Sequence, residues 1–73
     1  MLMDSAMADI LQGREIIIEF QPIGDLMRVS AMDAETLTEV VIQGPKSAGE
    51  ALLKRNVLKR LEYVLVKKGL ARS

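Results

Sequence analysis

Side chains that could carry out acid–base, nucleophilic or metal chemistry are sparse in this sequence of 73 residues. Histidine and cysteine are absent, which removes the commonest proton-transfer group, the thiol nucleophile and the usual zinc ligands. The carboxylates Glu15 and Glu19 have the spacing of one strand face, where contact with water is a simpler interpretation than catalysis. The serines have no histidine to activate them. We therefore expect no enzyme activity, no metal site and no bound cofactor.

Two other features would suit an anionic ligand. The run Gly44–Ser47 resembles part of a phosphate-binding loop, but the first glycine and the spacing of G-x-x-x-x-G-K-[ST] are missing. A strand exit followed by a helix cap accounts for this run better. Charge is also divided, because residues 1–45 carry a net −6 and residues 46–73 a net +6. A basic surface can bind nucleic-acid phosphates without sequence preference, and the candidate contacts are Arg55, Lys59, Arg60 and Lys67.

This basic surface is the weaker of two functional interpretations. No aromatic residue is expected among the four cations, and the acidic first half of the chain would repel nucleic acid. A solvated face or a contact with a protein partner therefore explains the charges more simply. Nucleic-acid binding is kept as the alternative.

A long amphipathic helix is expected from Ser47 to Lys68. Ser47 and Glu50 form the S-x-x-E pattern of a capping box, and Gly69 follows the last turn. At about 100° per residue, one broad face of this helix is apolar. Its members are Leu53, Val57, Leu58, Leu61, Val64 and Leu65. The opposite side is mostly charged but also carries Leu52, Tyr63 and Val66.

The residues before the helix have the pattern of three strands. Alternating apolar and polar residues predict strands over Arg14–Gln21, Leu26–Asp33 and Leu37–Gln43. Residues typical of turns separate them at Pro22–Asp25 and Asp33–Thr36. Consecutive strands joined by short turns favour an antiparallel meander.

The expected register places Phe20 opposite Met27, and Val29 opposite Val40. One face of the sheet is then apolar and should receive the helix. That face consists of Ile16, Ile18, Phe20, Met27, Val29, Ala31, Thr38, Val40 and Ile42. The other face is mixed, with charged residues around Ile17, Leu37 and Val41.

The chain is short for the apolar surface that it carries. A domain of this size buries only roughly 60% of its unfolded surface, and without disulfides or metals a second copy is the common remedy. A three-stranded sheet also leaves two edges open, and exchange of a strand or helix between copies would cover them. Scattered exposure of single apolar residues is the simpler alternative. The candidate dimer interface consists of Ile17, Leu37, Val41, Leu52, Tyr63 and Val66.

The expected fold is α+β: a three-stranded antiparallel β-meander followed by one long C-terminal helix (β-β-β-α), with an intertwined or domain-swapped homodimer as an option. Residues 14–73 form the single domain, and residues 1–13 are a tail or a short helix. No run approaches the roughly 20 apolar residues of a membrane span. Asp4 and Asp9 stand where a secretory signal would be basic. We expect a small cytoplasmic homodimer that acts as an interaction or accessory module with an unidentified protein partner.

A resemblance to a known family points the same way. The run Val29–Val40, followed by Gly44-Pro45 and then Leu58–Leu65, resembles a family of short alphaproteobacterial proteins of unknown function. The resemblance covers residues 14–68 and implies a compact β-β-β-α subunit in an intertwined homodimer. It implies no activity, so no functional residue is transferred. Leu37 stands where relatives would be expected to have glycine, which implies a different second turn here.

Overall fold

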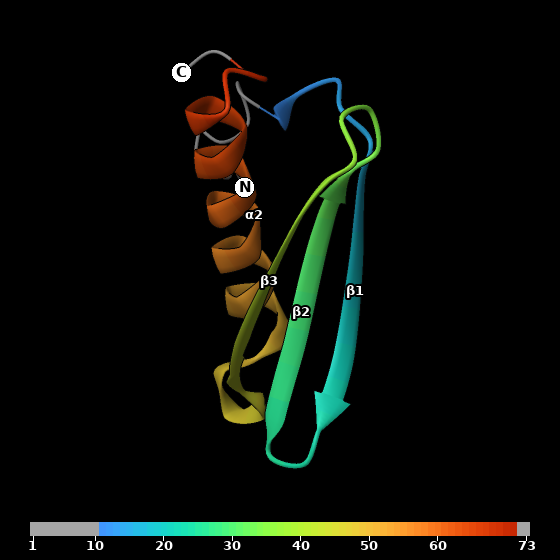
Figure 1. The fold of residues 1–73 in the computed structure, drawn as a ribbon. Coiled ribbons are helices and arrows are strands. Elements are labelled where there is room, and N and C mark those ends of the chain that lie inside the picture. Colours follow the sequence, from blue (N-terminus) through green and yellow to red (C-terminus); the bar gives the residue numbers. More distant parts are fainter. Residues whose placement is uncertain (1–10, 72–73) are drawn as a thin grey trace.

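The computed structural model describes residues 11–71, in which a three-stranded sheet is followed by one long helix (Figure 1). The elements are β1 (Ile16–Ile23), β2 (Leu26–Asp33), β3 (Thr38–Pro45), the 3-10 turn η1 (Lys46–Ala48) and α2 (Glu50–Lys67). The strands pair antiparallel in the order β1-β2-β3, which confirms the predicted β-β-β-α meander. Of the tail or short helix expected over residues 1–13, residues 1–10 lie outside the described range.

The first hairpin is tighter than the sequence pattern suggested. The chain turns through Gly24 and Asp25 alone, and Gly24 has a φ of 58°. A glycine with positive φ at the first central position is typical of a type II′ hairpin, whose twist suits the flanking strands. Pro22, expected in the turn, therefore lies within β1. Phe20 consequently pairs with Val29 instead of Met27.

The second hairpin has a longer loop and a strained residue. Ala34–Leu37 connects β2 to β3, and the Leu37 N–H donates to the Asp33 carbonyl at 2.7 Å. Leu37 has a φ of 60°, a left-handed conformation that costs a residue with a Cβ roughly 1–2 kcal/mol. The expected register is wrong here too, because Val29 pairs with Ile42 instead of Val40. Both shifts are two residues, so the side chains within the three strands stay on their predicted faces. Leu37, predicted on the outer face of the third strand, lies in the loop instead.

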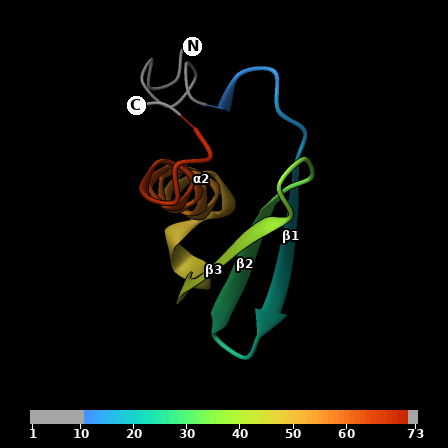
Figure 2. The same ribbon diagram turned by 45° about the horizontal axis from the view of Figure 1, so that its top comes forward.

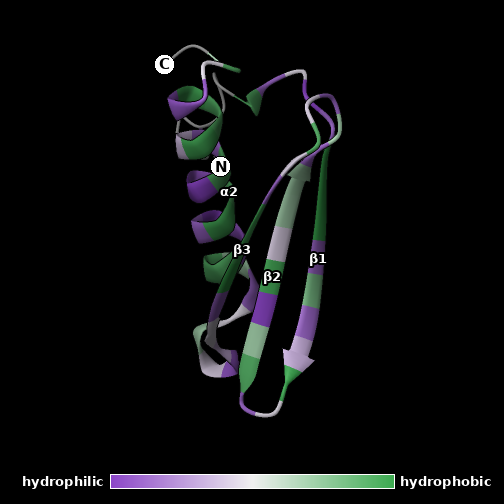
Figure 3. Ribbon diagram, viewed as in Figure 1, coloured by the Kyte–Doolittle hydropathy of each residue, from purple (hydrophilic) through white to green (hydrophobic). Residues whose placement is uncertain are grey.

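The core lies between α2 and the inner face of β2 and β3. Figure 3 shows apolar residues on the side of α2 that faces the sheet. Gly44 permits this contact, because a Cβ at that position would lie 2.6 Å from Leu53 Cδ2. The buried apolar residues are Val29, Ala31, Val40, Leu53, Val57, Leu61 and Leu65. The predicted apolar face of the helix is thus confirmed, with Leu58 and Val64 half-buried at its margins.

The structure matches the predicted end of α2 but not its predicted start. The predicted start at Ser47 is wrong: Ser47 lies in η1, and Gly49 is the N-cap, with no side-chain hydrogen bond to the helix. Gly49 has φ 88° and ψ 149°, a conformation open mainly to glycine, and this is where the chain changes direction from η1 into α2. The end at Gly69 is confirmed. Leu70 N donates to Leu65 O and Gly69 N to Val66 O, which are the two bonds of a Schellman motif.

Candidate functional site

The outer face of the sheet, which points away from α2, combines acidic and apolar side chains. Ile17 of β1 pairs with Met32 of β2, and Val41 of β3 pairs with Ser30 of β2. Ile17 and Val41 therefore lie in adjacent cross-strand rows. Ile17 and Val41 are each 42% exposed. Glu15 and Glu19 lie beside them on the β1 side. This face therefore offers a narrow apolar strip with negative charge around it, opposite to the helix.

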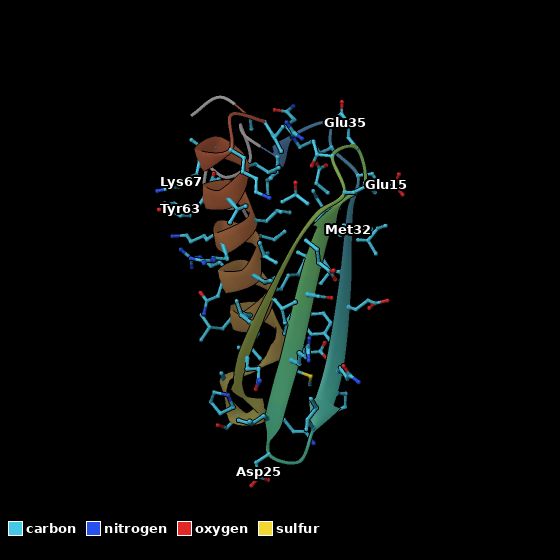
Figure 4. All side chains as sticks on the ribbon, viewed as in Figure 1. Glu15, Asp25, Met32, Glu35, Tyr63 and Lys67 are labelled. Atoms are coloured by element: carbon cyan, nitrogen blue, oxygen red, sulfur yellow. The ribbon has the colours of Figure 1, made fainter. Side chains whose placement is uncertain are left out.

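The outer face of α2, which points away from the sheet, is basic and carries an aromatic ring. Tyr63 is 54% exposed, and Arg60 and Lys67 each place a charged group 5.8 Å from the centre of its ring. Tyr63 and Lys67 project from the side of α2 away from the sheet (Figure 4). The expectation that no aromatic residue lies among the cations is wrong, because residues three and four apart on a helix are neighbours. Leu52 is also exposed on this helix.

The four candidate nucleic-acid contacts do share one surface. Arg55, Lys59, Arg60 and Lys67 are all exposed on α2 and lie outside its buried stripe. Glu62 is half-buried among them and reduces the positive charge locally. The arrangement is compatible with attraction to phosphates, and no described contact identifies a nucleic acid as its ligand.

The six candidate interface residues do not form one surface. Leu52, Tyr63 and Val66 belong to the helix, whereas Ile17 and Val41 lie on the opposite side of the molecule, on the outer sheet face. Leu37 is 71% exposed in the loop between β2 and β3. A single flat contact with a second copy cannot therefore include all six. The role of these residues in dimerisation stays a prediction.

A buried polar cluster at one end of the sheet was not anticipated from the sequence. The Arg14 guanidinium donates from Nη1 to Asp33 Oδ2 at 2.7 Å and from Nη2 to the Leu70 carbonyl at 2.8 Å. The Thr36 hydroxyl also donates to Asp33 Oδ2, at 2.8 Å. Asp33 is fully buried, while the Arg14 side chain is 15% exposed. The cluster thereby joins the start of β1, the second hairpin and the segment after α2.

The cluster determines the protonation of Asp33. Burial alone would raise the pKa of this carboxyl, since it disfavours the charged form. The hydrogen bond from the Thr36 hydroxyl, the charge of Arg14 and the backbone N–H groups of Thr36 and Glu35 act in the opposite direction and are stronger together. The pKa of Asp33 is therefore lowered from its ordinary value of 3.8, and the residue is ionised at neutral pH. Glu35 Oε1 lies 3.9 Å from Arg14 Nη1 and is mostly exposed.

The position of Asp33 gives a signal that sequence reasoning could have used. Asp33 has the same parity as the inward-facing Val29 and Ala31, so alternation along β2 directs it to the inner face. A carboxylate in that position needs a partner, because an unpaired buried charge is costly. Arg14 and Arg28 are the two cations in residues 1–45, and Arg28 has the opposite parity. The pairing of Arg14 with Asp33 could therefore have been proposed.

The free edge of β1 is the least covered part of the sheet. α2 packs against β3 and β2, and Figure 2 shows the helix on the β3 side, with β1 at the far edge. The inner-face residues of β1 are consequently only half-buried: Ile16, Ile18 and Phe20. These residues contact the margin of the core and present apolar surface beside an unpaired strand.

The residues considered for catalysis or anion binding are either exposed on the surface or needed for packing. Glu15 and Glu19 are exposed on the outer sheet face, and Gly44 is required for the close approach of Leu53. Among residues 11–71, no group of three or more histidine, cysteine, aspartate or glutamate residues is placed to hold a metal ion. Within the same described range, no helix combines the length and apolar character needed to cross a membrane.

Comparison with known proteins supports the coarser part of the resemblance, a domain of unknown function. A family model described as a domain of unknown function, DUF6898, matches residues 13–69, which include all three strands, η1 and α2. Searches of curated proteins and of solved structures each found no match. The match spans most of the chain and the whole of the described fold. The chain therefore belongs to the DUF6898 family of domains of unknown function.

Proposed function

We propose that this chain is a small, non-catalytic interaction module of a bacterial cytoplasm and that it acts as a homodimer. The supporting observation is the ratio of exposed to buried apolar side chains. Seven apolar residues of the described chain are buried, whereas eight large ones are at least 41% exposed. Larger monomers also expose apolar atoms, but this many exposed large apolar side chains beside so small a core favour association. The eight exposed residues are Ile17, Ile23, Leu26, Leu37, Val41, Leu52, Tyr63 and Leu70.

Sedimentation equilibrium tests the proposed homodimer directly. At about 100 µM chain we expect twice the monomer mass, with the monomer fraction rising on dilution as mass action requires. Matched variants then locate the contact. Leu52→Ser removes apolar surface from the outer helix face, and Val41→Thr does so from the outer sheet face. A monomer mass for the unaltered chain at that concentration would refute the proposal.

A second candidate function is binding of nucleic acid through α2. The specific observation is that Tyr63 is exposed between Arg60 and Lys67, each 5.8 Å from the ring centre. An aromatic ring that can stack on a base, with cations on either side for phosphates, is a combination found in single-stranded nucleic-acid binding. The net +6 of residues 46–73 adds to the attraction at this face, whereas the net −6 of residues 1–45 opposes it.

Fluorescence anisotropy with labelled single-stranded RNA and DNA tests this candidate. Binding should occur below about 10 µM at low salt and weaken steeply as salt is added. The double variant Arg60→Gln/Lys67→Gln should weaken binding, and Tyr63→Leu should weaken it at unchanged charge. Arg28→Gln, on the outer sheet face, is the matched control. Binding that is insensitive to salt or to these helix variants would exclude the candidate.

A further inference from the structure

The unpaired edge of β1 lies on the side of the sheet that α2 leaves uncovered. We propose that two copies of the chain join through this edge, with β1 paired antiparallel to β1 of the second copy, to give one continuous six-stranded sheet. The inference rests on the proposed homodimer and specifies its interface. It is supported by the direction of the backbone groups, by the register that they permit and by the charges of the competing surfaces.

The direction of the backbone groups follows from the first hairpin. In an antiparallel strand, alternate residues direct both N–H and C=O toward the same neighbour. Glu15 O accepts a hydrogen bond from Ala34 N at 3.0 Å, so the odd-numbered residues of this stretch face β2. Pro22 has even parity, and a proline fits in a strand where its missing N–H would face the free edge. The backbone N–H groups of Ile16, Ile18 and Phe20 are therefore directed outward.

A symmetric pair of β1 strands can satisfy all of these donors. With the two-fold axis at Ile18, each Ile18 pairs with its copy and Ile16 pairs with Phe20 of the second copy. Every outward N–H then meets a carbonyl, which gives roughly six backbone hydrogen bonds, two at each pair. Pro22 lacks the N–H needed to extend the ladder beyond Phe20, so the paired stretch ends there.

Side chains agree with the same register. On the inner face, half-buried Ile16 and Phe20 are brought together and Ile18 meets its own copy, which continues the apolar face across the two-fold axis. On the outer face, this register would place Ile17 opposite Glu19 of the second copy. A shift of the axis to Glu19 would instead place two like charges directly opposite, which is destabilising in a sheet. It would also match Ile16 with Pro22, which has no donor.

The other surfaces are less suited to a second copy. Contact between two outer helix faces would oppose the cations Arg55, Arg60 and Lys67 with themselves, and contact between two outer sheet faces would oppose Glu15, Glu19 and Glu39. Like charges across an interface cost affinity. The edge of β3 lies beside α2, which projects on that side of the sheet in both views (Figures 1 and 2). A strand added to β3 would meet the helix, whereas a strand added to β1 would not.

Cysteine cross-linking tests the interface and its register, since the chain has no native cysteine. Ile17 and Glu19 are exposed on the outer face, so substitution there leaves the core intact. In the proposed register they form a pair without hydrogen bonds, whose Cα atoms lie about 4.5 Å apart, within reach of a disulfide. The Ile17→Cys and Glu19→Cys variants are unfolded and refolded together at equal concentrations, then oxidised gently. The mixture should form a covalent heterodimer at least about tenfold faster than either variant alone.

Two controls make the outcome decisive. A mixture of Ile17→Cys and Gln21→Cys reports the register shifted by two residues and should cross-link slowly. Sedimentation equilibrium of the unaltered chain runs in parallel. A dimer by sedimentation without selective cross-linking of positions 17 and 19 overturns the β1 interface and leaves the proposed homodimer standing. A monomer by sedimentation overturns both.

Discussion

Removal of the Arg14 guanidinium should destabilise the fold more than any other substitution of a cation in the described chain. In Arg14→Ala, Asp33 loses a charged donor at 2.7 Å and the Leu70 carbonyl loses one at 2.8 Å. Asp33 is fully buried in the intact chain, so its carboxylate depends on protein donors. The second hairpin and the segment after α2 would also lose their common tether.

The magnitude follows from the burial of the pair. Breaking a buried ion pair by removal of one partner costs roughly 3–5 kcal/mol, because the other charge stays buried and uncompensated. The Arg14 side chain is 15% exposed, and Thr36 still donates to Asp33 in the variant, so we expect about 3 kcal/mol. A chain of 73 residues has a total stability of about 4–11 kcal/mol. The variant should therefore be close to unfolding at moderate temperature.

The loss of unfolding free energy in Arg14→Ala should change with pH in a predictable direction. The pKa of Asp33 is lowered in the folded chain, so the ionised carboxylate stabilises the fold at pH values above its ordinary pKa of 3.8. That contribution is lost as the pH falls through the folded-state value. In Arg14→Ala the charge that lowers the pKa is gone, while burial still raises it. The difference in unfolding free energy between the two proteins should therefore be largest near neutral pH and shrink in acid.

Urea unfolding followed by circular dichroism, at one fixed chain concentration and several pH values, measures this difference. Arg28→Ala is the matched control, because Arg28 is exposed on the outer sheet face and should change stability by less than about 0.5 kcal/mol. A loss below about 1 kcal/mol for Arg14→Ala, or a loss that stays constant from acid to neutral pH, would refute the role assigned to the cluster.

Two further substitutions test the backbone positions. Leu37→Gly should raise the unfolding free energy by about 1 kcal/mol, because Leu37 holds a φ of 60° with its side chain 71% exposed. A lower urea midpoint for this variant would contradict the prediction. Gly44→Ala should lower the unfolding free energy by roughly 1–3 kcal/mol, since the added Cβ would lie 2.6 Å from Leu53 Cδ2 in the core. Gly13→Ala is the control: a Cβ there meets open space, so only the cost of its φ of 82° should appear. An unchanged midpoint for Gly44→Ala would show that Leu53 can move aside freely.

The faces of the sheet could be predicted because they depend on parity alone. Both registers deduced from the sequence were wrong by two residues, yet Phe20 and Val29 still face α2. The first error arises at Pro22, a typical turn residue that a free edge accommodates within β1. The second arises at Leu37, which the pattern places in a strand although it lies in the loop before β3. The helix stripe was equally predictable, since a spacing of three and four residues leaves no other arrangement of Leu53 and Leu61.

The start of α2 and the polar cluster were not predicted, for different reasons. Ser47 has the cap pattern, but Gly49 allows a sharper change of direction after η1, and no local rule ranks the two. Asp33 is expected at the boundary of a strand and a turn, a position from which burial does not follow, so the sequence reasoning does not pair it with Arg14. The proposed dimer contacts depend on which surfaces α2 leaves open, and the helix position over β3 and β2 is set by packing as a whole.

Amide hydrogen exchange of β1 tests the central claim, that the chain associates through this edge, most directly. The account predicts that the N–H groups of Ile16, Ile18 and Phe20 are protected at high chain concentration and exchange faster on dilution. Val41 and Gln43, whose N–H groups lie on the opposite edge, should exchange at rates that do not change with concentration. Rapid exchange of the three β1 amides at every concentration, or protection that appears at β3 instead, would contradict it.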